Sequence, residues 1–150
     1  MRLAAGLALA FVLHTVLAQG TAEMRVVPSS HRFDALLERV ERAVEKHGLG
    51  VVARASASRG AAARGVKIPG NAVVMVFRND FAVRLLAASV AAGIEAPLRI
   101  YLTENGDGTA TLSYRRPSAV FAAYRHPEID KLARELDMLI ERIAADAAGG

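Results

Sequence analysis

Residues 96–114, APLRIYLTENGDGTATLSY, constrain the fold more than any other part of the sequence. Three apolar residues of its first half alternate with three polar ones, which gives the order Leu98, Arg99, Ile100, Tyr101, Leu102, Thr103. Residues 109–114 alternate in the same way, and the turn between the two halves, Asn105-Gly106-Asp107-Gly108, contains both dipeptides that favour tight hairpin turns. The stretch therefore predicts an antiparallel β-hairpin with one apolar face, which the rest of the chain has to cover.

The rest of the chain supplies further strands and helices. Strand patterns occupy residues 24–28, 49–56 and 72–77, and the unbroken apolar run of the last, AVVMVF, predicts a central strand buried on both faces. Helical spacing predicts one helix between the possible cap Ser29-Ser30 and Gly48, a second over residues 81–92, and a third from Pro127. The order β-α-β-β-α-β-β-α predicts an α+β fold, a mostly antiparallel sheet with helices packed on one face.

The N-terminus has the three parts of a secretory signal peptide. Arg2 is followed by an apolar run over residues 3–17 and then by small residues that offer cleavage sites near Ala18 to Ala22. We therefore expect a signal peptide over residues 1–22, a single α+β domain over residues 23–150, and a secreted or periplasmic protein. The alternative is an uncleaved N-terminal anchor, and we expect no other contact with the membrane.

Composition excludes several classes of site. The chain has no cysteine, which removes disulfides, thiolate zinc sites, iron–sulfur clusters and cysteine nucleophiles. The net charge of +4 is spread along the chain, so we expect no nucleic-acid partner. The spacing of His31, His47 and His126 is not that of a metal site. We expect neither a bound metal nor a cofactor.

The first candidate site is the end of the strand 72–77. Asn79 and Asp80 stand where this strand leads into a helix, and the free amides at a helix start favour anions. With Arg78 beside them they predict a small-anion site. The alternative is that Asn79 or Asp80 caps the helix, which is the commoner role of these residue types.

The second candidate site is the hairpin, which carries Arg99, Tyr101, Glu104 and Tyr114. Arginine presents a bidentate fork to carboxylates and phosphates, so these residues predict a patch that binds such a group. The alternative is a structural ion pair or a solvated face of the sheet, because an arginine within an apolar strand has to be paired or exposed.

The sequence resembles the bacterial domain-of-unknown-function 302 family. The resemblance covers essentially the whole mature chain and rests on short motifs, which are His31-Arg32-Phe33-Asp34, Lys46-His47-Gly48-Leu49, Val76-Phe77-Arg78-Asn79-Asp80, Ala96-Pro97-Leu98-Arg99, the acidic glycine turn, and Ser113-Tyr114 with Pro117. Arg78-Asn79-Asp80 stands where many members carry Gly-Asn-Pro, so the chain resembles a divergent, exported branch. The resemblance implies a compact α+β domain that is often dimeric, and it implies no established activity.

Three functions remain open from the sequence. The first is an exported, non-catalytic module that binds a small molecule, an anion or a partner protein. The second is a hydrolase- or transferase-like enzyme that uses Arg99, Tyr114 and an acid such as Glu104 or Asp80, and it requires these groups to converge on one pocket. The third is an assembly role, in which helix 81–92 or an edge strand forms a homodimer.

Overall fold

The computed structural model describes residues 24–149, so the predicted signal peptide lies outside the described residues. Its centre is a five-stranded antiparallel sheet with the strand order β1-β5-β4-β3-β2. The strands are β1 (Met24–Arg32), β2 (Gly50–Ala55), β3 (Asn71–Phe77), β4 (Leu98–Glu104) and β5 (Thr109–Arg115). The predicted hairpin is thus β4 and β5, next to each other in the middle of the sheet.

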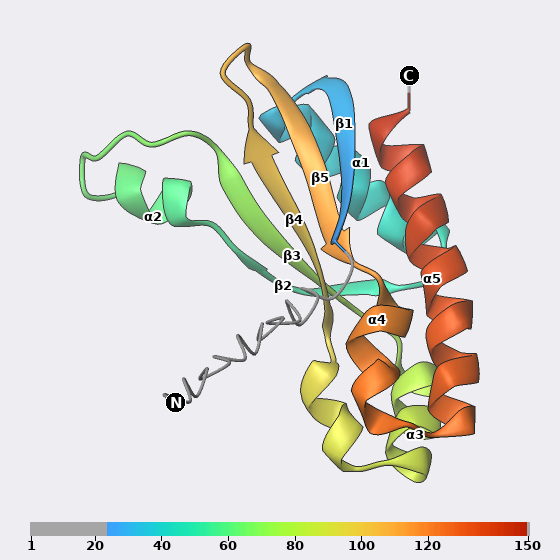
Figure 1. Ribbon diagram of the computed structural model, residues 1–150. Coiled ribbons are helices and arrows are strands. Elements are labelled where there is room, and N and C mark those ends of the chain that lie inside the picture. The colour runs from blue at the N-terminus through green and yellow to red at the C-terminus, as the bar shows by residue number, and fades with distance from the viewer. Residues whose placement is uncertain (1–23, 150) are drawn as a thin grey trace, which may run out of the picture.

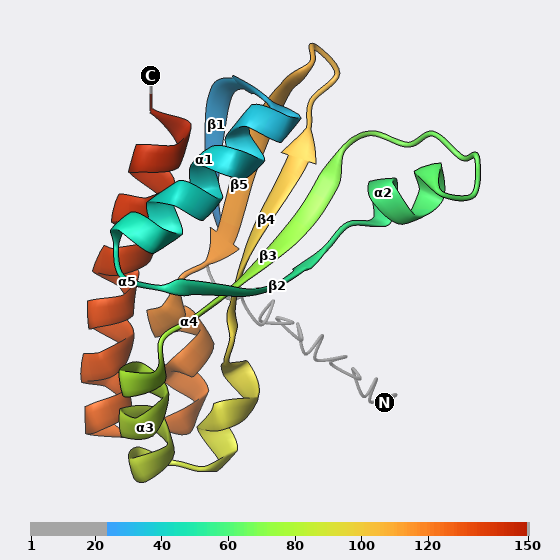
Figure 2. The ribbon, with the colours of Figure 1, turned by 180° about the vertical axis from the view of Figure 1, so that it is seen from behind.

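The helices lie on one side of this sheet. They are α1 (Phe33–Lys46), α2 (Ala57–Ala62), α3 (Asn79–Ala88), α4 (Pro117–Phe121) and α5 (Pro127–Ala148), with short 3₁₀ turns η1 (Ala91–Glu95) and η2 (Ala122–Tyr124). Helix α1 lies behind the sheet in Figure 1 and in front of it in Figure 2, and α5 runs alongside, packed on α1 and on the edge strand β1. The predicted α+β fold is confirmed. None of the helices within residues 24–149 is long and apolar enough to span a membrane.

The alternation predicted for the hairpin is confirmed. Ile100 and Leu102 of β4 and Ala110 and Leu112 of β5 are buried under the helices, whereas Tyr101 is exposed on the other face. The turn is held by the carboxylate of Asp107, which accepts a hydrogen bond from the backbone N–H of Thr109 at 2.9 Å. Burial of the apolar residues on one face therefore sets the side of the sheet that carries each hairpin residue.

Two local expectations are wrong. Strand β3 alternates between buried residues (Ala72, Val74, Val76) and partly exposed ones (Val73, Met75, Phe77), so only one of its faces is covered. Strand β1 continues to Arg32, and Ser29-Ser30 therefore lies in a strand and does not cap α1. The hydroxyl of Ser29 instead accepts a hydrogen bond from the N–H of His31 at 3.0 Å, where the register of β1 shifts.

Between β2 and β3 the chain leaves the sheet as a projecting segment, residues 56–70, which we call the α2 arm (Figures 1 and 2). Its base is tied to Asn71, whose N–H donates to the hydroxyl of Ser58 at 3.1 Å and whose side-chain oxygen accepts from the N–H of Ala57 at 3.0 Å. Within the arm, the hydroxyl of Ser56 caps α2 by accepting from the N–H of Arg59. These bonds fix the first turn of α2 next to the first residue of β3.

Candidate functional site

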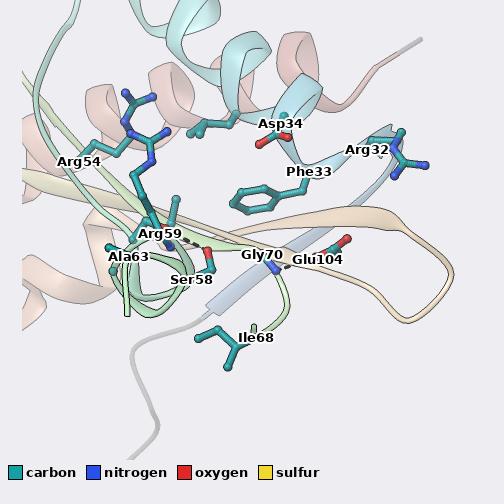
Figure 3. Close-up of a pocket in the computed structure, with 14 residues that line it drawn as sticks. Arg32, Phe33, Asp34, Arg54, Ser58, Arg59, Ala63, Ile68, Gly70 and Glu104 are labelled. Carbon is teal, nitrogen blue, oxygen red and sulfur yellow. Dashed lines mark hydrogen bonds between the residues drawn. The ribbon is translucent and has the colours of Figure 1, made fainter. Parts of the chain in front are cut away.

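A groove of about 710 Å³ lies between the N-terminal end of α1, the α2 arm and the end of β4 (Figure 3). Arg54 pairs in register with Val74, which faces the core, so the groove opens on the helix side of the sheet. The residues that line it are Arg32, Phe33, Asp34, Leu37, Arg54, Ser56, Ser58, Arg59, Gly60, Ala63, Ile68, Gly70, Ala72 and Glu104. Its volume is within the usual range for small-molecule sites.

The floor of the groove depends on a close approach between Phe33 and Gly70. A Cβ atom on Gly70 would lie 2.7 Å from Cγ of the Phe33 ring, which is closer than real contacts allow. Glycine at this position therefore lets the ring lie flat against the base of the arm. Leu37 and Ala72 continue the apolar lining beside it.

One side of the groove is cationic. Arg54 donates from Nη1 to the carboxylate of Glu41 on α1 at 2.8 Å, which orients its guanidinium. The guanidinium of Arg59 has no hydrogen-bond or ion-pair partner within residues 24–149. Figure 3 draws both arginine side chains on the same side of the groove, with Glu104 on the other. This side can accept a carboxylate, phosphate or sulfonate through charge-assisted hydrogen bonds.

The opposite side of the groove is acidic and is fixed by the hairpin. The carboxylate of Glu104 accepts a hydrogen bond from the N–H of Gly70 at 2.7 Å, while the N–H of Glu104 donates to the carbonyl of Gly70 at 2.8 Å. Asp34 lies in the first turn of α1, where a carboxylate is stabilised by the helix dipole. Arg32 also lines this side (Figure 3), so the groove combines an apolar floor with two arginines on one side and a mixed set of Asp34, Glu104 and Arg32 on the other.

The strand-end site predicted from Arg78, Asn79 and Asp80 lies elsewhere in the structure and is already paired internally. Arg78 donates from Nε and Nη2 to both carboxylate oxygens of Asp80, at 2.7 and 3.0 Å. These hydrogen bonds hold the pKa of the Asp80 carboxyl below its ordinary value. Helix α3 begins at Asn79, so neither Asn79 nor Asp80 is the N-cap, and Arg78 occupies that position without a side-chain cap bond.

The neighbouring cation is paired as well. Arg84 forms a bidentate ion pair with Glu135 of α5, with both N–O distances at 2.8 Å. The guanidinium of Arg78 lies 4.0 Å from the centroid of the Phe81 ring, which adds a cation–π contact. The charged side chains at this strand end therefore form ion pairs within the chain, and the alternative that Asn79 or Asp80 caps the helix is wrong.

The structure divides the hairpin residues among three places. Arg99 and Tyr101 lie on the open face of the sheet, and Glu104 lines the groove. Tyr114 points into the core on the helix side, and burial raises the pKa of its phenol. Because Arg99 and Tyr114 lie on opposite faces, the convergence required by the predicted enzyme site is not formed. Within residues 24–149 no group of three or more His, Asp or Glu side chains could hold a metal ion.

Sequence reasoning missed the residues that build the groove, in particular Phe33, Arg54, Arg59 and Gly70. Pro69-Gly70 carries an ordinary turn signal, and Phe33 fits the apolar stripe of α1. One clue was available, because Arg54 interrupts a strand of small and apolar residues with a charge. The close approach of Phe33 and Gly70 joins residues far apart in sequence, so no local sequence pattern predicts it.

Comparisons with known proteins agree with this fold. The family model described as "Domain of unknown function DUF302" matches residues 25–147. The chain is also similar to the crystal structure of an uncharacterized conserved DUF302 protein from Bacillus stearothermophilus, with a TM-score of 0.71 and 20% sequence identity over 83% of this chain and 97% of that one. At that identity the likeness concerns the fold alone. A search of curated proteins gave no match.

Proposed function

The chain belongs to the DUF302 family, and on this premise we propose that it is a non-catalytic module that binds a small organic anion in the groove between α1 and the α2 arm. The observation that carries the proposal is the guanidinium of Arg59, which has no partner in the described part of the chain and stands beside an apolar floor. An arginine that is only solvated would not have to stand beside an apolar surface, and a purely apolar ligand would not require a guanidinium. The combination favours a ligand that has both an anionic end and an apolar body.

The groove assigns a place to each part of that ligand. The anionic end pairs with Arg59 and with Nη2 of Arg54, because Nη1 of Arg54 is engaged by Glu41. The body lies over Phe33 and the adjacent apolar residues. Glu104 and Asp34 stand on the other side together with Arg32, so the most concentrated positive charge is at Arg54 and Arg59, and the anionic end is assigned there.

A thermal-shift screen of the purified protein tests this proposal. The panel consists of aromatic and aliphatic carboxylates and sulfonates, each paired with its neutral amide. We expect the anions to raise the melting temperature of the protein and the neutral amides to leave it unchanged. Titration calorimetry of the best compound should give about tenfold weaker binding to the Arg59→Ala variant, the effect of one charge-assisted hydrogen bond.

Arg64→Ala is the matched control, because Arg64 lies on the same arm but does not line the groove. It should bind the compound as the wild type does. If the amides bind as well as the anions, or if both variants behave alike, then the groove is not an anion site and the proposal fails.

We extend the proposal to location and assign the protein to the secreted or periplasmic space. The support is the sequence pattern of residues 1–22, a charged start, an apolar run and small residues. Mass spectrometry of the protein from the periplasmic or extracellular fraction should find a new N-terminus near Ala18 to Ala22. Recovery of the intact chain in the membrane fraction would indicate the uncleaved anchor instead.

A second candidate function, homodimerisation, is favoured by one specific observation. Four apolar side chains on α3 and the turn after it are exposed by 46–81%: Val83, Leu86, Val90 and Ile94. Leu86 packs against Gly93, which joins the two elements into one patch, and residues 85–94 carry no charge. A second copy of this neutral surface would meet it without like-charge repulsion. Sedimentation should detect a dimer that Val90→Asp dissociates, and a wild-type monomer at all concentrations would exclude it.

A further inference from the structure

The open face of the sheet carries two arginines at opposed positions. The ladder between β4 and β5 pairs Tyr101 with Ser113 and Ile100 with Tyr114. One step further in the same register, Arg99 stands opposite Arg115, and both side chains are exposed. They alternate with the buried residues Ile100 and Tyr114, so both lie on the face of the sheet opposite α1.

Neither guanidinium forms an ion pair or a hydrogen bond within residues 24–149. The cross-strand neighbours on either side are Met24, opposite Arg115, and Met75, opposite Arg99, and neither carries a charge. Glu95 borders the same region, but its carboxylate accepts from the hydroxyl of Tyr124 at 3.1 Å, and no ion pair joins it to either arginine within residues 24–149. Like charges at opposed positions of a sheet destabilise it, so the arrangement calls for a counter-charge from outside.

The surface around the two arginines is hollowed. A depression of about 320 Å³ is lined by Arg99, Arg115 and, in the next row of the sheet, the cross-strand pair Tyr101 and Ser113, with Glu95 also in its lining. Two guanidinium forks and two hydroxyl groups therefore surround one space. A carboxylate can neutralise only one guanidinium, whereas a phosphate near neutral pH carries close to two charges and three acceptor oxygens.

From this arrangement we infer that the open face of the sheet holds a site for a phosphate group, bound between Arg99 and Arg115 with the hydroxyls of Tyr101 and Ser113 as further donors. The site lies on the face opposite the groove and does not depend on the function proposed for it. The partly exposed ring of Tyr101 and its cross-strand neighbour Val73 offer an apolar contact to the organic part of a phosphate ester.

Calorimetric titrations of the full chain with phenyl phosphate, inorganic phosphate and benzoate test the inference. We expect both phosphates to bind more tightly than benzoate, and Arg99→Gln and Arg115→Gln each to weaken phosphate binding about tenfold, the effect of one charged hydrogen-bonding group. Arg64→Gln, a distant exposed arginine, is the control and should bind as the wild type. Tighter binding of phenyl phosphate than of inorganic phosphate would assign the site to an ester, and equal binding would assign it to the free anion. Both results support a phosphate site.

Three results would overturn the inference: benzoate binding as tightly as the phosphates, undiminished phosphate binding by Arg99→Gln and Arg115→Gln, or loss of phosphate binding only in Arg59→Ala, which would place the phosphate in the groove.

Melting temperatures give a second readout, because the difference between the wild type and Arg99→Gln should change sign when phosphate is added. At low ionic strength without phosphate, Arg99→Gln should melt above the wild type because a repulsion is removed. At a phosphate concentration of about one hundred times Kd, the wild type should gain several degrees and pass the variant. A variant that melts below the wild type without phosphate would contradict the inference, because it would mean that Arg99 has a stabilising partner.

Discussion

Glu104 and Gly70 are joined by two hydrogen bonds, one from the N–H of Gly70 to the carboxylate at 2.7 Å and one from the N–H of Glu104 to the carbonyl of Gly70 at 2.8 Å. The first residue ends the strand β4 of the hairpin, and the second stands at the base of the α2 arm. The pair thereby connects the most regular element of the chain to the wall of the groove. The position of the arm, and with it the shape of the groove, depends on this connection.

Replacing Glu104 should loosen the arm without unfolding the domain. Glu104→Ala removes the acceptor of the Gly70 N–H, and the expected loss in the free energy of unfolding is at most about 1 kcal/mol because the bond is exposed. Amide hydrogen exchange at Gly70 should become faster. The control is Glu104→Gln, which keeps a carbonyl acceptor and should retain most of the protection of the Gly70 amide. Equal exchange at Gly70 in the wild type and in Glu104→Ala would show that the bond does not hold the arm.

Gly70→Ala should obstruct the groove. The new Cβ would lie 2.7 Å from Cγ of Phe33, so the ring has to move, at a cost of about 1–3 kcal/mol in the free energy of unfolding. Affinity for the best compound of the screen should fall as well. The control is Gly60→Ala, which also lines the groove but has no atom within 4 Å of its Cβ position and lies inside α2. That variant should be stabilised by about 0.5–1 kcal/mol, the usual gain in a helix. If the two variants lose affinity equally, the contact with Phe33 does not shape the site.

Asp137 should be the most sensitive polar residue of the core. Its side chain is buried and accepts hydrogen bonds from the N–H of Ser118 at 2.9 Å, from the Ser118 hydroxyl at 2.5 Å and from Nη2 of Arg116 at 3.1 Å. Asp137→Ala leaves these donors without their acceptor, and urea unfolding should give a loss of about 3 kcal/mol. Glu141→Ala, on the exposed side of the following turn of α5, is the comparison and should stay within about 0.5 kcal/mol of the wild type.

The ion pairs between α1 and α5 should make part of the stability depend on pH. Asp146 accepts hydrogen bonds from Lys46 and His47 at 2.8 Å, and these hold the pKa of its carboxyl below the ordinary value. A lowered folded-state pKa contributes stability that is complete above the unfolded pKa, about 4, and is lost as the pH falls through the folded value. Asp146→Asn should thus be less stable than the wild type at pH 7 and about equal to it near pH 2. A constant difference in the free energy of unfolding between these pH values would contradict this assignment.

The parts of the fold that local pattern determines could be predicted from the sequence. The alternation in residues 96–114 predicted the hairpin and its buried face, and Gly48, with a φ of 75°, ends the first helix as predicted. The partial exposure of β3 could not be predicted in this way, because an apolar run does not reveal that no helix of residues 24–149 covers its second face. The same limit explains the failed cap at Ser29-Ser30, where pairing with β5 extends the strand past a local helix signal.

The site was harder to predict for a related reason. The groove depends on the contact between Phe33 and Gly70 and on the direction of the α2 arm, which is set by the bonds of Asn71 to Ser58 and Ala57. These contacts join segments that are distant in sequence, so they cannot be predicted from composition or residue spacing. The opposed arginines Arg99 and Arg115 differ from the groove in this respect, because their placement follows from a local turn. The turn at residues 105–108 fixes the register of β4 and β5, whose last pair is Ile100 with Tyr114, and one further step of that register places Arg99 opposite Arg115.

Amide chemical-shift mapping by NMR tests whether the groove between α1 and the α2 arm binds a small organic anion. The tightest carboxylate or sulfonate from the screen is titrated into the isotope-labelled protein. We expect the largest shifts on Phe33, Ser58, Gly60 and Gly70, which line the groove. Shifts confined to the open face around Arg99, shifts confined to the apolar patch around Val90, or no shifts at saturating ligand would contradict binding in the groove.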